Sequence, residues 1–297
     1  MPAPKRLLCA LVALGLIAAA VPLRAEAPSP AGRVVSLNPS LSQILIALDA
    51  ADVLIGVDVA SKRLYPELAE LPSVGGLFDP SLEAVVALEP DLVVLVPSVE
   101  QRDFRGRLGA LGVPTHAFRN IRFEEVLANI RDLGRLVGRE RQATAVVERI
   151  RSTRAAVERL AASRERVRCL VVLQRNPVFL AGSGSFLDEM LASAGCDNLG
   201  RALGEGYPRA SLEWLVAAAP DVIVDMSLDA AGGRALDYWK HWPTLPAVRR
   251  DRVLHVDAEL VTMPGAALDQ ALTTLARALH GSAVDARIEG FVAEQRE

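Results

Sequence analysis

One pattern of fourteen residues occurs twice, as SLEAVVALEPDLVV at Ser81–Val94 and as SLEWLVAAAPDVIV at Ser211–Val224. The copies are identical at eight of fourteen positions and lie 130 residues apart, counted between the shared glutamates (213 − 83). In each copy a serine can cap a short helix, a Pro-Asp pair ends it, and an apolar run follows. Such a run is typical of a strand buried on both faces of a parallel sheet. The repeat therefore predicts two similar lobes.

Strands alternate with helices around both copies. Apolar runs predict strands, and helical spacing predicts the helices between them. The expected strands are Val34–Leu37, Val53–Val57, Leu92–Val96, Thr115–Phe118, Cys169–Leu173, Val222–Asp225 and Val253–Val256. The expected helices include Leu82–Leu88, Phe104–Leu111, Phe186–Leu191, Leu212–Ala218 and Ala266–Leu279. We therefore predict an α/β fold with two Rossmann-like lobes, each on a mainly parallel sheet.

A long amphipathic segment separates the two copies. No glycine or proline occurs from Glu140 to Arg168, and apolar residues recur there at helical spacing. This predicts one rigid helix of roughly 25 residues, about 40 Å long. The expected division is a signal peptide at 1–25, an N-terminal lobe at 33–138, a linking helix at 139–167, a C-terminal lobe at 168–283 and a tail at 284–297. A ligand cleft is expected between the lobes, at the carboxyl ends of their strands.

The composition indicates a globular, exported protein. The 297 residues are 51% hydrophobic and 23% charged, and the net charge of −3 gives no support to nucleic-acid binding. Lys5 and Arg6 precede an apolar run from Leu7 to Val21, and small residues follow, which is the order of a secretory signal peptide. Cleavage is expected after Ala25. Because Cys9 precedes the cleavage region, no lipid anchor is expected, and the mature protein belongs in the periplasm.

Several short motifs together resemble a known family. They are Ser36–Ser40, Gly56–Asp58, Pro72–Gly76, both copies of the repeat, and Leu245–Val248 followed by Arg252 and Val253. In this order and spacing the mature chain resembles the periplasmic substrate-binding proteins of ABC importers for cobalamin, ferric siderophores and haem, in the class with a helical hinge. The resemblance implies a monomeric receptor that has no cofactor and catalyses no reaction.

The resemblance also implies a role for the repeated glutamates. In that family the matching residues, one per lobe, contact arginines of the two permease subunits, and here they are Glu83 and Glu213. A permease dimer with twofold symmetry offers the same patch twice, so a monomeric receptor must present two similar surfaces. Carboxylate–guanidinium pairs suit such oriented docking. The alternative is that both glutamates only stabilise the N-termini of their helices.

The ligand is expected to contact the loops that follow the strands. All three tyrosines and two of the three tryptophans fall in these loops, which fits a large ligand with apolar faces. The alternative for each aromatic residue is ordinary anchoring of a loop to the core. The candidate ligand-binding residues are Asn38, Tyr65, Leu77, Phe78, Arg175, Phe179, Tyr207, Arg209, Trp239 and Trp242.

The resemblance narrows the ligand to a metal chelate. Haem-binding relatives often carry a tyrosine at the position of Gly76, so cobalamin or a ferric siderophore is favoured here and haem is the alternative. A second alternative is a receptor for a bare zinc or manganese ion, but the four histidines form no pair at ligand spacing and no metal ligand is assigned. The third alternative is an enzyme. The sequence contains neither a nucleophile elbow nor a phosphate loop with its lysine, so no catalytic residue is assigned.

The mature chain holds two cysteines, Cys169 and Cys196. Export makes a disulfide chemically possible. The sequence alone leaves a bridge and a free buried pair equally open, because it does not show how close the two side chains lie.

Overall fold

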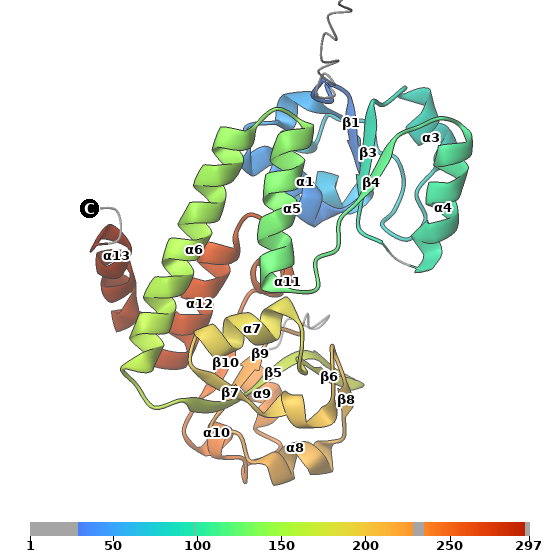
Figure 1. Cartoon of the computed structure of the whole chain (residues 1–297). Helices are drawn as coiled ribbons and strands as arrows, with labels where there is room; N and C mark the ends of the chain where they lie inside the picture. The colour runs from blue at the N-terminus through green and yellow to red at the C-terminus, as the bar shows by residue number, and fades with distance from the viewer. Residues whose placement is uncertain (1–28, 98, 228–234, 295–297) are drawn as a thin grey trace, which may run out of the picture.

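The computed structural model describes residues 29–97, 99–227 and 235–294, with the side chains of 99–102 excepted (Figure 1). The expected signal peptide at 1–25 lies outside the described residues. Figure 1 shows two lobes, one above the other, beside a set of longer helices. Within the described part of the chain, no helix is long and apolar enough to cross a membrane.

The N-terminal lobe is built on a parallel sheet with the strand order β2-β1-β3-β4. The apolar runs of the sequence form its central strands, and every residue of β1 and β3 is buried. The strands are β1 (Val34–Ser36), β2 (Leu54–Val57), β3 (Leu92–Leu95) and β4 (Thr115–Ala117). The helices are α1 (Pro39–Ala47), α2 (Val59–Leu64), α3 (Leu82–Ala87), α4 (Val99–Ala110) and α5 (Phe123–Leu136), with short 3₁₀ turns at Ala51–Val53 and Pro66–Leu68.

The C-terminal lobe has a mixed sheet with the order β10-β9-β5-β6-β8, and β7 also pairs with β5. Its strands β10, β9, β5 and β7 are parallel, whereas β6 and β8 are antiparallel additions. The strands are β5 (Val167–Arg175), β6 (Val178–Leu180), β7 (Cys196–Asn198), β8 (Arg209–Ala210), β9 (Val222–Asp225) and β10 (Val253–His255). The helices are α7 (Phe186–Ser193), α8 (Leu212–Ala218), α9 (Ala235–Trp239), α10 (Pro246–Arg249), α11 (Ala258–Thr262), α12 (Leu268–His280) and α13 (Asp285–Glu294), with 3₁₀ turns at Leu199–Leu203 and Ser282–Val284.

The long helix α6 (Glu140–Ala162) runs from the upper lobe to the lower one (Figure 1). It is not alone at this junction, because α5, α12 and α13 pack against it. One core of buried residues extends from Val34 in β1, through Ile150 in α6, to Val224 in β9. Since this core is continuous, the apolar side chains that stabilise each lobe also hold the two lobes together.

The two copies of the repeat have the same local structure. Ser81 and Ser211 are the N-caps of α3 and α8, and each side chain accepts a backbone N–H from the third residue that follows it. Glu89 and Ala219, again 130 residues apart (219 − 89), both adopt a left-handed backbone with φ of 46° and 47°. The helix, the reversal and the buried strand are therefore repeated as one unit.

An arginine outside the repeat completes this unit in both lobes. Arg33 precedes β1 and donates to the carbonyl of Leu88, and Arg168 in β5 donates to the carbonyl of Ala218. The two acceptors occupy the same position of the repeat (218 − 88 = 130). Each arginine satisfies a carbonyl at the C-terminal end of α3 or α8, which the helix itself leaves without a donor.

Cys169 and Cys196 form a disulfide with a Cα–Cα distance of 5.8 Å. The bridge joins the neighbouring parallel strands β5 and β7, and both cysteines are buried. The sequence left open whether the two cysteines form a bridge or a free buried pair, and the structure contains the bridge.

The segment expected as a C-terminal tail contains helix α13, which packs on α6. Arg159 of α6 forms an ion pair with Glu294 at 2.6 Å, and its guanidinium lies 4.1 Å from the centre of the Phe291 ring. The sequence also did not predict α5, β6, β7 and β8. In α5 the apolar residues Phe123, Val126 and Ile130 recur at helical spacing, which was a usable signal.

Candidate functional site

A cavity of about 500 Å³ lies between the two lobes. The N-terminal lobe contributes the loop before α5, and the C-terminal lobe contributes the loops before α7 and β8, the last residue of α11 and the segment after it. The apolar lining residues are Ile121, Phe186, Tyr207 and Pro264. The polar ones are Asn120, Ser183, Ser185, Glu205 and Thr262. This mixture, in a volume of this size, is typical of a site for a small organic ligand.

The N-terminal wall of the cavity is a short, fixed loop. The backbone N–H groups of Ile121 and Arg122 both donate to one carboxylate oxygen of Glu125, at 2.9 and 3.0 Å. The side-chain amide of Asn129 donates to the carbonyl of Arg119 at 2.6 Å. These bonds hold the loop while the Ile121 side chain stays 50% exposed, so it offers apolar surface to a ligand.

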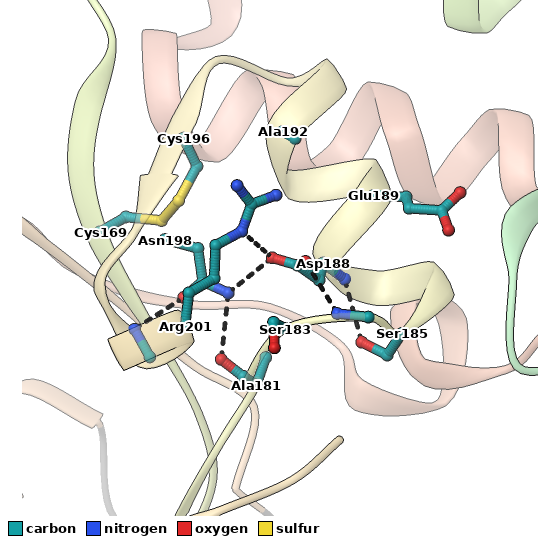
Figure 2. A network of polar contacts seen from close by, with 12 residues as sticks. Cys169, Ala181, Ser183, Ser185, Asp188, Glu189, Ala192, Cys196, Asn198 and Arg201 are labelled. Carbon is teal, nitrogen blue, oxygen red and sulfur yellow. Dashed lines mark hydrogen bonds and ion pairs between the residues drawn. A yellow bond between two sulfur atoms is a disulfide. The ribbon is translucent and has the colours of Figure 1, made fainter. Parts of the chain in front are cut away.

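The C-terminal wall is held by the buried carboxylate of Asp188 (Figure 2). It accepts hydrogen bonds from the backbone N–H of Gly184, the amide of Asn198 and the guanidinium of Arg201, at 3.1, 2.9 and 2.7 Å. The hydroxyl of Ser185 accepts from the backbone N–H of Asp188 at 3.2 Å and caps α7. A buried carboxylate with this many donors is well satisfied, and it fixes the loop that lines the cavity.

The two walls are joined by bonds between helix starts. The backbone N–H of Phe186, the first residue of α7, donates to the carbonyl of Ile121 at 2.6 Å. In return, the backbone N–H of Phe123, the first residue of α5, donates to the Glu189 carboxylate of α7 at 3.3 Å. An ion pair between Arg122 and Glu189 at 3.4 Å reinforces this contact. Each lobe thus provides an acceptor for an N–H group that the other lobe's helix leaves free. These bonds hold the cavity residues Ile121 and Phe186 in place.

Two tyrosines near the lobe junction are protonated at neutral pH. Burial raises the pKa of the Tyr207 phenol, and a hydrogen bond with Ser185 opposes part of that rise. Burial and the nearby carboxylates of Asp58 and Glu259 raise the pKa of Tyr65 to about 12. Both phenols therefore act as neutral hydrogen-bonding groups unless a metal displaces the proton.

Only Tyr207, of the ten predicted ligand residues, lines the cavity. Asn38 caps α1 through its side-chain oxygen, and the hydroxyl of Tyr65 donates to the sulfur of Met263 at 3.0 Å. Phe78 is 68% exposed in the loop before α3 and Leu77 beside it is half-buried. Three more predicted residues lie outside the lining. Phe179 on β6 and Trp242 in the turn after α9 are half-buried, and Arg209 on β8 is exposed.

Two of the predicted ligand residues, Trp239 and Arg175, are buried in the interior of the C-terminal lobe. Trp239 is fully buried, and its indole N–H donates to Asp225 at 2.6 Å. Arg175 is 8% exposed and pairs with the same carboxylate at 2.9 Å, with its guanidinium 4.9 Å from the Tyr238 ring centre. The composition of these loops suggested ligand contact, but the aromatic and cationic side chains here neutralise and cover a buried aspartate.

The two repeated glutamates are exposed at the starts of α3 and α8. A hydrogen bond to its own backbone N–H, then one with Ser211, lowers the pKa of Glu213. Figure 1 places α3 on the outer edge of the upper lobe and α8 at the bottom of the lower lobe. Neither glutamate lines the cavity between the lobes.

Comparison with known proteins identifies the family. Residues 34–260, well over half of the chain, match the family described as periplasmic binding protein. The chain belongs to this family. The location that the family name states, the periplasm, agrees with the expectation from the sequence.

Several similar proteins are named for binding vitamin B12 or haem. A vitamin B12-binding protein of Vibrio parahaemolyticus is 26% identical over 240 residues, which cover 80% of this chain and 86% of the relative. The haem-binding protein RhuT of Roseiflexus sp. RS-1, solved in its apo form, is 26% identical with a TM-score of 0.74, covering 84% of this chain and 98% of that one. The vitamin B12-binding protein BtuF of Vibrio cholerae has the same fold, with a TM-score of 0.73 at 23% identity, covering 84% and 97%. The predicted two-lobed α/β fold is therefore confirmed.

The residues that sequence reasoning missed are those before α5 and α7. Ile121 lies just before α5, and Phe186 is the first residue of α7. Loops at such helix starts often contact the ligand in α/β proteins. Without a prediction of α5, nothing in the sequence placed Ile121 near a ligand, and the Gly-Ser-Gly-Ser run at 182–185 leads into the cap of α7, where Ser185 binds the backbone N–H of Asp188. In the described part of the chain, no group of three or more His, Cys, Asp or Glu residues could hold a metal ion.

Proposed function

We propose that the protein captures a metal chelate, either cobalamin or a related corrinoid or a ferric siderophore, and delivers it to an ABC importer in the inner membrane. The observation that carries this proposal is the cavity between the lobes, which both lobes line with apolar and with polar residues. The vitamin B12-binding relatives support the corrinoid. The proposal includes export through the N-terminal signal peptide, a monomeric state and no catalytic residue.

Haem is the second candidate, because one cavity residue suits it. Tyr207 lines the cavity, and a tyrosine can hold haem iron as an axial ligand. Gly76 does not supply such a ligand, and an added Cβ there would meet the carboxylate of Asp79. Solved haem-binding relatives at 26% identity support this candidate.

Direct titration separates the candidates. We expect the purified protein to bind cobalamin or a ferric siderophore with one-to-one stoichiometry in calorimetry, and native mass spectrometry after periplasmic extraction should show the retained chelate. Binding of haem alone, with a Soret band that changes in Tyr207→Phe, would favour the second candidate. If cobalamin, haem and a panel of ferric siderophores all fail to bind, the proposal of a metal-chelate receptor is wrong.

Two side chains of the cavity should determine most of the affinity. Ile121→Asp and Tyr207→Ala each remove exposed apolar surface that a bound ligand would bury, and Ile121→Asp adds a charge. Covering a side chain of this size contributes about 1.5–3 kcal/mol, so each change should weaken binding by roughly tenfold or more. Calorimetry with the identified ligand measures this. Leu111→Asp is the matched control, because Leu111 is 56% exposed at the end of α4 and does not line the cavity. An equal loss in the control would contradict the assignment.

A further inference from the structure

We propose that a second cavity, of about 560 Å³ at the other end of α7, binds a phosphate-type oxyanion. It shares no lining residue with the cavity between the lobes. Four arginines line it, from α6, from the segment between α6 and β5, and from the turn after β7: Arg154, Arg164, Arg166 and Arg201. The carboxylates in its lining are Glu158 and Glu189.

Two of the four arginines have no carboxylate partner among the described residues. The guanidinium of Arg166 donates to the carbonyls of Ala192 and Cys196, at 3.4 and 2.5 Å. Arg164 donates to the carbonyl of His280 at 3.5 Å, and its Nε is buried without an acceptor. Carbonyls orient these guanidinium groups but leave their two positive charges unneutralised, next to a cavity that an anion can enter.

The lining carboxylates do not supply the missing charge, because they are already paired. Glu158 accepts from Arg154 at 2.9 Å, and the hydroxyl of Ser193 also donates to it. Glu189 pairs with Arg122 at the lobe junction. The excess of positive charge therefore remains at Arg164 and Arg166.

The fourth arginine is held so that its free end faces the cavity. Of the guanidinium nitrogens of Arg201, only Nε donates to Asp188, and Figure 2 shows the rest of this guanidinium on the side of Ala192, another lining residue. Neither terminal nitrogen of Arg201 has a protein acceptor in the described structure. Asp188 thus acts as a positioning residue that presents two N–H₂ groups of Arg201.

A dianionic oxyanion matches this arrangement in charge and geometry. About two negative charges would neutralise the two unpaired arginines. A flat guanidinium group can donate two parallel N–H bonds to two oxygens of one phosphate or sulfate. Near the cavity, burial is the main cause that lowers the pKa of His280, and the positive charges of Arg164 and Arg252 lower it further. A phosphate group can come from free phosphate or from the headgroup of an anionic lipid, and both have this chemistry.

Calorimetry with inorganic phosphate and with sulfate, against chloride at equal ionic strength, tests the site. We expect one saturable site in the wild type, and a loss of affinity of about tenfold or more in the double variant Arg164→Gln, Arg166→Gln. The matched control is Arg105→Gln, Arg107→Gln, which removes two exposed arginines of α4, and it should bind phosphate like the wild type. Thermal unfolding confirms that both variants are folded. No saturable binding in the wild type, or equal binding in both variants, overturns the proposal.

Flotation with vesicles identifies the source of the phosphate group. Binding to phosphatidic acid vesicles but not to phosphatidylcholine vesicles, lost in Arg164→Gln, Arg166→Gln and kept in the control, assigns the site to a lipid headgroup. Phosphate binding without flotation assigns it to the free anion. Both results support an oxyanion site, and binding in the cavity between the lobes should be unchanged in this variant, so the site is tested independently of the proposed function.

Discussion

A protein with both Glu83→Ala and Glu213→Ala is expected to bind its ligand like the wild type and to support almost no uptake. Both glutamates are exposed at the first turn of matching helices, and neither touches the cavity between the lobes. We propose that they contact arginines on the two subunits of the permease. Because removing one partner of a close interfacial charge pair strongly weakens docking, the double change should reduce uptake by roughly a hundredfold or more.

The repeated local structure supports this proposal, in which two contacts are needed. A twofold-symmetric permease would present one patch twice, and the chain carries two units that have the same cap, the same left-handed residue and the same arginine beneath the helix end. Each single variant should therefore retain part of the uptake, because one of the two contacts remains.

The measurement is uptake of the labelled ligand in cells that carry each variant, with ligand affinity measured in parallel on the purified protein. A matched control is Glu70→Ala with Glu289→Ala, which removes two exposed glutamates elsewhere on the chain. Normal uptake by the Glu83→Ala, Glu213→Ala protein would contradict docking, and the two glutamates would then serve only to stabilise the N-termini of their helices. A loss of ligand affinity in this protein would place the glutamates at the ligand instead.

The sequence predicted the architecture well, because buried parallel strands and helix caps have local signals. The helix predicted at Leu212–Ala218 and the strand at Val222–Asp225 have those bounds in the structure. Three strands of the C-terminal sheet were missed: β8 has two residues, and β6 and β7 have three each, which is too short to show a periodicity.

The site was harder to predict, because residue type alone does not tell a ligand contact from a buried network. Trp239 and Arg175 have the chemistry of ligand residues, yet both bind the buried carboxylate of Asp225. Ile121 has no distinctive chemistry, and it matters only because the bonds between α5 and α7 bring its loop to the cavity. Tertiary contacts of this kind join residues 65 positions apart (186 − 121), and the sequence pattern does not record them.

The disulfide between Cys169 and Cys196 is expected to stabilise the fold more than any other single pair of residues does. It closes a loop of 27 residues, and a bridge of this span stabilises a fold by about 3 kcal/mol, mainly by restricting the unfolded chain. The variant Cys169→Ala, Cys196→Ala should therefore unfold roughly 6–12 °C lower than the oxidised wild type. Both cysteines are buried, so a mild reductant should act on the folded protein only slowly.

A double-mutant cycle separates the bridge from simple packing. If the bridge is the source of the stability, each single change, Cys169→Ala or Cys196→Ala, already removes it, and the double variant costs little more than either single one. Two independent buried thiols would instead give costs that add. Denaturant unfolding of the four proteins, with the wild type measured oxidised and reduced, provides the cycle. Additive costs, or a reduced wild type as stable as the oxidised one, would contradict a stabilising bridge between β5 and β7.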